Sequence, residues 1–236
     1  MDKASNLFVY GLWSDKEKDE TRGHFVMKVD AMSFKILNTE INEFSPKVLE
    51  DAGVSKNNIA KGRGIEHLRI DSRGFTADGG LIIFCENYES SVSLNSGNPR
   101  RSYLEIYVIK YSKDVKQEWV NQIFKRQYAT EDGFSYMSFG KQVVGNKVYL
   151  IYNDNKNVGK TFEKDKVQDL RIYSSSHTMM VTIEPDGTMK KKMIADNDPM
   201  PATVTPEIIY PMSDNKLILP AQSLKSYSRF GFLELE

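Results

Sequence analysis

The chain has 236 residues, of which 40% are apolar and 27% are charged, and its 32 basic residues equal its 32 acidic ones. This length and composition suffice to bury a core, which excludes wholesale disorder. A formal net charge of zero argues against a dedicated nucleic-acid-binding protein, so we expect no nucleic acid partner. No apolar run approaches the roughly 20 residues that span a bilayer, so we expect no transmembrane segment. The first residues also lack the basic and apolar stretches of a signal peptide.

Three strand-like runs open the chain, each rich in aromatic and β-branched residues. The charged stretch between the first two runs is predicted to be a solvated loop. Pro46 to Ala52 favours one or two helical turns, because proline suits the first turn of a helix. The polar segment Ser55–Gly64 is predicted to be a connection. The three strands are predicted at Asn6–Ser14, Gly23–Ala31 and Ile36–Phe44.

The segment from Glu66 to Gln127 predicts four consecutive strands joined mostly by turns, which is the antiparallel unit of β-propeller blades. The one long connection, Glu89–Arg101, contains Ser, Asn, Gly and Pro and is predicted to be exposed. The four strands are predicted at Glu66–Phe75, Gly79–Tyr88, Ser102–Ser112 and Gln117–Gln127.

Two further groups of strands follow. Pro185, Asp186 and Gly187 favour a tight hairpin in the third group, because glycine tolerates a positive φ angle. Its long insertion, Asp154–Ser176, is predicted to hold one short strand at Leu170–Tyr173. The third group is predicted at Phe134–Val144, Lys147–Asn153, His177–Glu184 and Thr188–Ala195, and the last at Val204–Met212, Lys216–Ser223 and Arg229–Leu235.

Similar apolar strands recur at nearly fixed spacing, centred on Phe8, Ile82, Tyr149 and Ile218. Such spacing favours repeated structural units. We therefore predict an all-β fold, a β-propeller-like array of four-stranded antiparallel sheets, as one domain or propeller segment over residues 1–236. The repeat units are predicted at about 1–45, 65–128, 134–197 and 202–236. Ile82 is predicted to be a core residue of this array.

The predicted first unit lacks an opening strand and the last lacks a closing strand. The chain is therefore either part of a larger propeller or an open array of sheets. Unpaired strand edges favour association, so we expect a protein partner, another copy of the chain, or a missing part of the same polypeptide.

Four segments carry a resemblance to a family: Gly79–Tyr88, Glu105–Lys110, Trp119–Gln127 and Val148–Asn155. Over about Ile65–Asn157 the chain resembles uncharacterised β-propeller-like proteins of Bacteroidetes-type bacteria. The resemblance implies an exported or cell-envelope-associated location, and it implies no activity and no catalytic residue.

Few residues suggest chemistry. The three histidines, His24, His67 and His177, lack the spacing of metal ligands, so we expect no metal site and no cofactor. His24 and His177 are predicted at strand edges. His67 is a binding candidate, because the first strands of propeller blades line the central channel. The single cysteine, Cys85, is predicted to be a small buried residue.

Two motif-like stretches are assigned to ordinary loops. Gly159-Lys160-Thr161 resembles the end of a phosphate-binding loop, but position 154 is Asp where that motif needs glycine. The alternating Asn153, Asn155 and Asn157 are better explained by an exposed turn than by a calcium loop, which would need an acidic twelfth position.

The remaining binding candidates are Glu86, Trp119, Lys125 and Arg126. Glu86 and Lys125 lie where apolar strands become polar, and we predict that they pair to fix strand register. The ring of Trp119 either stacks on a carbohydrate or packs between adjacent sheets, and the packing role is favoured. The run Lys190-Lys191-Lys192 is predicted to be a solvated strand edge.

The sequence thus favours a non-catalytic binding or scaffold module that recognises a protein or an envelope glycan through propeller loops. The alternative is a carbohydrate-active enzyme with a carboxylate-lined central pocket. The sequence names no catalytic residue, because it cannot place two carboxylates across a scissile bond.

Overall fold

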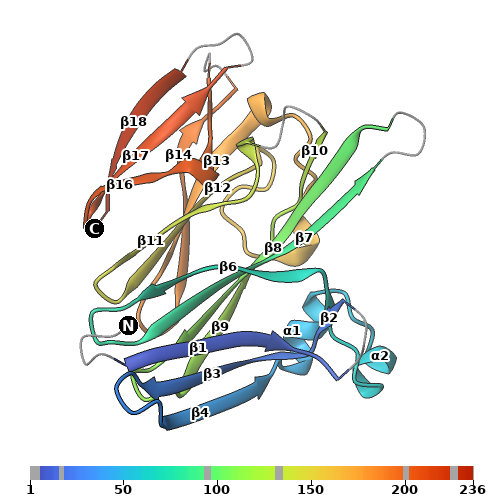
Figure 1. Ribbon diagram of the computed structural model, residues 1–236. Coiled ribbons are helices and arrows are strands. Elements are labelled where there is room, and N and C mark those ends of the chain that lie inside the picture. The colour runs from blue at the N-terminus through green and yellow to red at the C-terminus, as the bar shows by residue number, and fades with distance from the viewer. Residues whose placement is uncertain are drawn as a thin grey trace. The chain divides into compact units, whose positions relative to one another are not determined.

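The computed structural model describes residues 6–15, 19–92, 97–130, 135–198, 202–223 and 228–235. Antiparallel strands dominate the fold, and helices are few and short, as Figure 1 shows. The prediction of an all-β fold with several antiparallel sheets is confirmed. In the described ranges, no helix is both long enough and apolar enough to cross a membrane.

The chain divides into two compact units. The first unit comprises Met1–Tyr88 and Glu105–Gln122, and the second comprises Glu89–Leu104 and Ile123–Glu236. Two long strands contribute to both units, since β7 (Leu81–Val92) and β8 (Pro99–Tyr111) each continue across the division.

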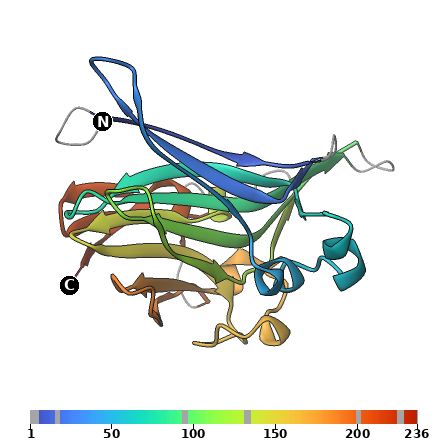
Figure 2. The ribbon, with the colours of Figure 1, turned by 90° about the horizontal axis from the view of Figure 1, so that it is seen from below.

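The first unit holds a three-stranded sheet of order β1-β3-β4 and the part of a second sheet in which β6, β7, β8 and β9 pair. Figure 2 shows β1, β3 and β4 in blue, with the β3–β4 hairpin ending in a free loop. Side chains of β1 alternate between the core and the solvent. Phe8, Tyr10 and Leu12 pack on the core, whereas Val9 is 44% exposed. The elements are β1 (Asn6–Trp13), β2 (Glu20–Thr21), β3 (Gly23–Asp30), β4 (Ile36–Glu43), β5 (Ile65–Glu66), β6 (Leu68–Phe75) and β9 (Gln117–Ile123).

Two helices cover one part of this core. The predicted helix is present as α1 (Pro46–Asp51), and its Leu49 is fully buried. The segment predicted to be only a connection contains a second helix, α2 (Lys56–Ala60), which Ser55 caps by accepting a hydrogen bond from the backbone of Asn58. The cap lets a polar run begin a helix that has no buried residue of its own.

His24 lies inside the core of the first unit, so its predicted place at a strand edge is wrong. It belongs to β3, the middle strand of its sheet, and is fully buried. Its Nδ1 atom hydrogen-bonds the hydroxyl of Tyr111, and its ring lies 5.0 Å from that of Phe44. Loss of hydration on burial lowers the pKa of His24 to about 4.

This burial predicts a pH-dependent stability of the first unit. Above pH 6.5 His24 is neutral in both states, but below it only the unfolded chain binds the proton until pH approaches 4. Between these values the unit should lose about 3 kcal/mol of unfolding free energy through His24. Urea unfolding measures this loss through tryptophan fluorescence, because Trp13 and Trp119 both lie in the first unit.

A comparison of the parent with a His24 variant separates the contribution of His24 to the pH dependence from that of the carboxylates, which also titrate at low pH. His24→Leu should be less stable at pH 7 but should show a shallower stability loss between pH 6.5 and pH 4. Equal slopes in parent and His24→Leu would refute the assignment.

The second unit holds a four-stranded sheet of order β11-β12-β13-β14, and a sheet in which β17 pairs with β18 on one side and with β15 and β16 on the other. The elements are β10 (Gln127–Thr130), β11 (Gly140–Val144), β12 (Lys147–Asn155), η2 (Lys164–Lys166), η3 (Tyr173–Ser175), β13 (Ser176–Ile183), β14 (Met189–Asp196), β15 (Thr203–Val204), η4 (Pro206–Ile208), β16 (Tyr210–Ser213), β17 (Lys216–Gln222) and β18 (Ser228–Glu234).

Several predicted strand boundaries are wrong. The connection Glu89–Arg101 is largely strand, because β7 continues to Val92 and β8 begins at Pro99. At its end, Arg101 and Arg100 of β8 stand opposite Ala129 and Thr130 of β10, and this pairing provides hydrogen-bond partners for extended backbone. The strand predicted at Gln117–Gln127 is divided into β9 and β10, which both pair with β8.

Other differences fall in the second unit. The run predicted at Val204–Met212 is broken by a 3-10 turn at Pro206, since proline lacks the N–H that a continuous strand would donate. The strand predicted at Leu170–Tyr173 is reduced to one parallel bridge between Leu170 and Gln127. Of the run predicted at Phe134–Val144, only β11 is strand, and Phe134 itself lies outside the described residues.

A buried polar cluster centred on Asn153 ties together strands of the second unit. Its Nδ2 atom donates to the carbonyls of Tyr136 at 3.0 Å and Val204 at 2.8 Å. Its Oδ1 atom accepts from Thr178 Oγ1 at 2.8 Å and from Asn197 Nδ2 at 3.3 Å. The exposed turn predicted for this stretch is therefore wrong at Asn153, which is fully buried and structural.

Lys191 also contradicts its predicted place on a solvated edge. Its side chain is 1% exposed, and Nζ lies 2.8 Å from Asp154 Oδ2 and 3.3 Å from the carbonyl of Thr161. Burial raises the pKa of Asp154, which is 2% exposed. The flanking Lys190 and Lys192 are exposed, because neighbouring residues of β14 point to opposite faces.

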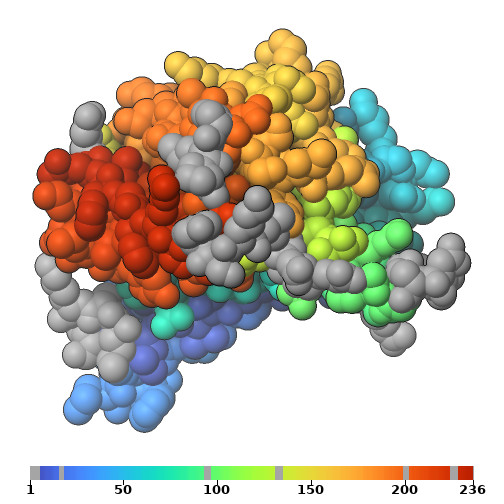
Figure 3. All heavy atoms as spheres, turned by 90° about the horizontal axis from the view of Figure 1, so that it is seen from above, coloured from blue at the N-terminus to red at the C-terminus, as the bar shows by residue number. Residues whose placement is uncertain are grey.

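The sheet of β15–β18 has a buried face and an apolar exposed face. Leu217 and Leu219 of β17 lie in the core. On the other face Phe230 and Phe232 are 66% and 71% exposed. Figure 3 shows the red surface of this last sheet in the space-filling view.

Candidate functional site

A cleft of about 550 Å³ opens in the second unit between β8, β10 and the segment 171–173. We name it the arginine–tyrosine cleft. Its lining residues are Ser91, Arg100, Arg101, Ser102, Tyr128, Ala129, Thr130, Arg171 and Tyr173.

Pairing of β10 with β8 forms one wall of the cleft. Tyr128 stands opposite Ser102, and Thr130 stands opposite Arg100. These residues share a face of the sheet, since residues two apart on a strand point the same way.

The insertion forms the other wall through one buried anchor. Leu170 is 2% exposed, and its backbone N–H donates to the carbonyl of Arg126 at 2.7 Å. Its carbonyl accepts from the N–H of Tyr128 at 2.9 Å. This pairing places the guanidinium of Arg171 4.9 Å from the centre of the Tyr128 ring, while Asp169 accepts from Arg171 Nη2 at 2.8 Å.

Tyr173 is held by stacking and by the backbone. Its ring lies 4.3 Å from the ring of Tyr136 at an interplanar angle of 15°. The Tyr136 hydroxyl donates to the carbonyl of Gln222 at 3.3 Å. Burial raises the pKa of Tyr136. Ser176 Oγ donates to the Tyr173 carbonyl at 2.5 Å. The second tyrosine of the cleft is therefore fixed before a ligand arrives.

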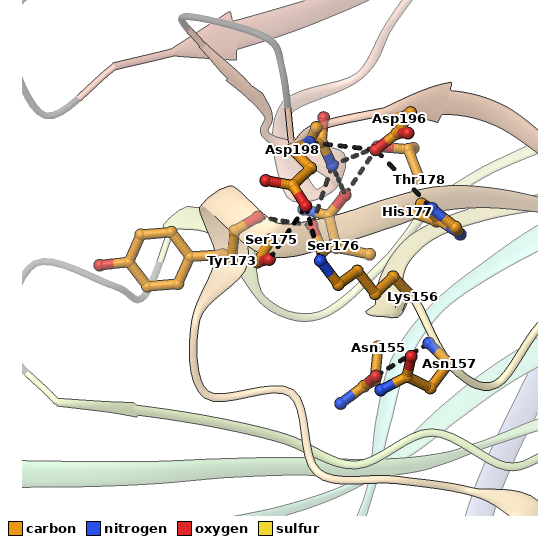
Figure 4. A network of polar contacts seen from close by, with 12 residues as sticks. Asn155, Lys156, Asn157, Tyr173, Ser175, Ser176, His177, Thr178, Asp196 and Asp198 are labelled. Carbon is orange, nitrogen blue, oxygen red and sulfur yellow. Dashed lines mark hydrogen bonds and ion pairs between the residues drawn. The ribbon is translucent and has the colours of Figure 1, made fainter.

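A polar network adjoins the cleft (Figure 4). Lys156 Nζ lies 2.6 Å from Asp198 Oδ2, which holds the pKa of that carboxyl below its usual value. Ser175 Oγ lies 3.5 Å from Asp198, whereas His177 lies 3.7 Å from Asp196. Because the serine and the histidine contact different carboxylates, these side chains do not form a serine–histidine–aspartate relay.

A smaller cleft of about 220 Å³ lies along the same insertion and shares Arg171 with the arginine–tyrosine cleft. Lys156 and Ser175 of the polar network also line it. The two clefts thus place Arg171 and Lys156 along one stretch of surface, with Asp169 and Asp198 as their respective ion-pair partners.

The lining of the arginine–tyrosine cleft combines positive charge with aromatic rings. Three arginines line it, and none of its described lining residues is Asp or Glu. Arginine offers a planar set of donors that matches a carboxylate, sulfate or phosphate group. A tyrosine supplies an apolar face and a polar tip. The cleft is therefore suited to an anionic ligand that also has an apolar face.

Among the residues predicted from the sequence, Lys125 and Arg126 lie in the second unit. Lys125 is fully buried and donates to Gln127 Oε1 at 2.8 Å. Arg126 contributes its backbone carbonyl to the Leu170 anchor. Neither residue lines the arginine–tyrosine cleft.

The other predicted residues, His67, Glu86 and Trp119, lie in the first unit. His67 is not on a strand: it sits between β5 and β6 with a φ of +56°, and its Nδ1 lies 2.8 Å from Asp19 Oδ2. Glu86 is fully buried in β7, 3.6 Å from the guanidinium of Arg69. Trp119 is half-buried in β9. A binding role for each, and a Glu86–Lys125 pair, remain predictions.

Arg100 and Arg101 were missed because they end a connection predicted to be an exposed loop. Arg171 and Tyr173 lie in the short strand predicted within the insertion, to which the sequence assigned no role. One signal was present: Arg171 and Tyr173 are two residues apart, the spacing at which extended backbone places side chains on one face.

Comparison with known proteins identifies no family. No family model matches the chain, and no curated protein matches it. Two crystal structures of ACO/RPE65 chimeras are similar at 11% and 10% identity, with TM-scores of 0.40 and 0.37. They cover 99% and 91% of this chain, which in turn spans 46% and 42% of theirs. The chain thus spans less than half of those proteins, and likeness at this level carries no inference about activity.

Proposed function

We propose that this protein is a non-catalytic binding module that recognises an anionic glycan through the arginine–tyrosine cleft. One observation carries the proposal: three arginines and two tyrosines line the same open cleft, without an Asp or Glu among its described lining residues.

The chemistry of an acidic sugar fits both kinds of side chain. Its carboxylate or sulfate accepts paired hydrogen bonds from a guanidinium. Its C–H face packs on an aromatic ring, which buries apolar surface while the hydroxyls stay in water. The fixed positions of Tyr128 and Tyr173 reduce the entropy lost on binding.

The alternative is a carbohydrate-active enzyme. Glycoside hydrolysis commonly uses two carboxyl groups roughly 5 to 10 Å apart across the scissile bond. Among the described residues that line the arginine–tyrosine cleft there is no such pair. Binding without turnover is therefore the function that this cleft supports best.

Calorimetric titration with an acidic oligosaccharide, such as a short oligogalacturonate, tests the proposal against a neutral oligosaccharide of equal length. We expect binding only to the acidic probe, weakened by added salt, because screening reduces attraction between charges. Arg171→Ala should lower the affinity by at least about tenfold, since it removes a charged hydrogen-bonding partner.

Arg69→Ala is the matched control for Arg171→Ala. The guanidinium of Arg69 also lies over a tyrosine ring, 3.6 Å from the centre of Tyr88, but in the first unit and outside the cleft. Arg69→Ala should leave the affinity for the acidic probe unchanged. Equal affinity for neutral and acidic probes, no binding of either, or cleavage of the probe would each refute the proposal, as would a protein ligand that competes for Arg171.

We further propose that the antiparallel sheets are arranged as blades of a propeller-like array in an exported or envelope-associated protein. The recurrence of similar sheets along the chain supports the first part. An experimental structure in which the sheets do not surround a common axis would refute it, and recovery of the native protein from the cytosolic fraction would refute the location.

A further inference from the structure

The loop of the β3–β4 hairpin exposes large apolar side chains. Met32 is 87% exposed, Phe34 74%, Ile36 62% and Leu37 55%. They lie within six consecutive residues of the first unit, at and beside the free loop seen in Figure 2. Single exposed apolar residues are ordinary, but a contiguous group marks an interaction surface.

The loop is held in one conformation by hydrogen bonds to Asp30. Its Oδ1 atom accepts from the N–H of Met32 at 3.1 Å, and from the N–H and hydroxyl of Ser33 at 2.6 and 2.8 Å. Its carbonyl accepts from the N–H of Phe34 at 2.9 Å. The hydrogen bonds from Ser33 lower the pKa of Asp30, so its carboxylate stays charged at neutral pH. The apolar side chains are thus presented by an ordered turn.

Phe34 adopts a backbone conformation that its side chain disfavours. Its φ is +56°, in the left-handed region that suits glycine and asparagine. Burial of the ring does not compensate for this strain within the first unit, because the side chain is 74% exposed. Strained residues of this kind occur at functional sites.

Lysines stand around the base of the loop. Lys28 precedes it on β3, Lys35 ends it, and Lys113 lies on the turn between β8 and β9. The three segments are neighbours, because Lys28 Nζ donates to the carbonyl of Lys113 at 3.0 Å. Acids also lie near these lysines: Asp30 in the loop, Asp114 beside Lys113, and Asp78, whose neighbour Gly79 lies against Lys113. Lysine can extend a long apolar stem beside such a loop and keep its charge at the level of lipid headgroups.

We propose that the β3–β4 loop is an interfacial anchor that inserts Met32, Phe34 and their apolar neighbours into an anionic lipid surface. The apolar tip would enter the boundary between headgroups and acyl chains, to a depth of roughly 5 to 10 Å. The lysines at its base complement anionic headgroups, which selects a lipid surface over an uncharged apolar groove. The proposal is independent of the glycan cleft in the second unit.

Co-sedimentation of the full chain with lipid vesicles tests the anchor. We expect binding to vesicles of phosphatidylcholine with phosphatidylglycerol, and much weaker binding to phosphatidylcholine alone. The variant Met32→Ser with Phe34→Asn should bind at least about a hundredfold less, because each of the two buried side chains contributes about a factor of ten or more. Phe34→Asn suits a positive φ, so lost binding would not reflect lost folding.

Phe230→Ser with Phe232→Ser is the matched control, because these residues are similarly exposed on the second unit. It should leave vesicle binding unchanged. The anchor is refuted if the parent protein does not bind anionic vesicles, if the tip variant binds as well as the parent, or if only the β18 variant loses binding. A protein ligand captured at the loop without vesicle binding would also overturn it.

A labelling experiment reports insertion directly. The single cysteine, Cys85, is fully buried, and burial raises the pKa of its thiol, so an environment-sensitive dye would react with an introduced cysteine instead. Dye at Phe34→Cys should shift to shorter emission wavelengths on anionic vesicles. Dye at Thr39→Cys, about 10 Å beyond Ile36 along β4 by strand rise, should not shift. Equal shifts at both positions, or none at Phe34→Cys, would contradict insertion of the loop.

Discussion

Lys191→Ala should lower the unfolding free energy of the second unit by about 3 to 5 kcal/mol. The substitution removes the cation 2.8 Å from Asp154 and leaves a buried carboxylate without its ion-pair partner. Both side chains are almost fully buried, so water cannot replace the lost contact. Lys190→Ala and Lys192→Ala, one residue away on the exposed face of β14, should each cost less than about 0.5 kcal/mol.

Amide hydrogen exchange in β12 and β14 measures this effect where it arises, since both tryptophans lie in the first unit and fluorescence does not report on the second. The double variant Asp154→Leu with Lys191→Met should recover most of the loss, because a packed apolar pair can replace a buried ion pair. Equal protection in the three single-lysine variants would show that the pair adds nothing to stability.

Ile82→Ala should cost the first unit about 2 to 5 kcal/mol of unfolding free energy. Ile82 is fully buried, and the adjacent Leu81 and Ile83 of β7 are also buried, so the strand is covered on both of its faces. Removing three methyl or methylene carbons leaves a cavity that neighbours on a paired strand cannot easily fill.

Urea unfolding followed by tryptophan fluorescence measures the loss. Val9→Ala is the control, since Val9 also lies on a strand of the first unit but is 44% exposed. It should cost less than about 1 kcal/mol. An Ile82→Ala variant no less stable than Val9→Ala would contradict the role of Ile82 in the core.

Local pattern was enough to predict most strands of the first unit. The run predicted at Gly23–Ala31 differs from β3 by one residue, because alternating large side chains both favour extended backbone and specify the buried face. The helix at Ser55 was missed because a single hydrogen bond from a cap, rather than an apolar stripe, begins it.

Features made by distant residues could not be predicted in the same way. A run of three lysines usually indicates exposure to solvent, but the middle lysine is buried in an ion pair with Asp154, 37 positions earlier in the chain. The arginine–tyrosine cleft depends equally on a distant pairing, that of Leu170 with Gln127. Nothing in either stretch alone identifies its partner, because the pairing is decided by the packed fold.

Because β7 and β8 contribute to both units, they constrain when each unit can fold during protein synthesis. The first unit needs the later half of β8 and all of β9 up to Gln122, but residues 89–104, which belong to the second unit, leave the ribosome before them. Unlike domains that follow one another along a chain, neither unit can finish folding before translation has begun the other. A ribosome stalled after Tyr88 would carry β1 to β6 and two thirds of β7 with no strand to close their core, and chaperone binding should be strongest in that interval.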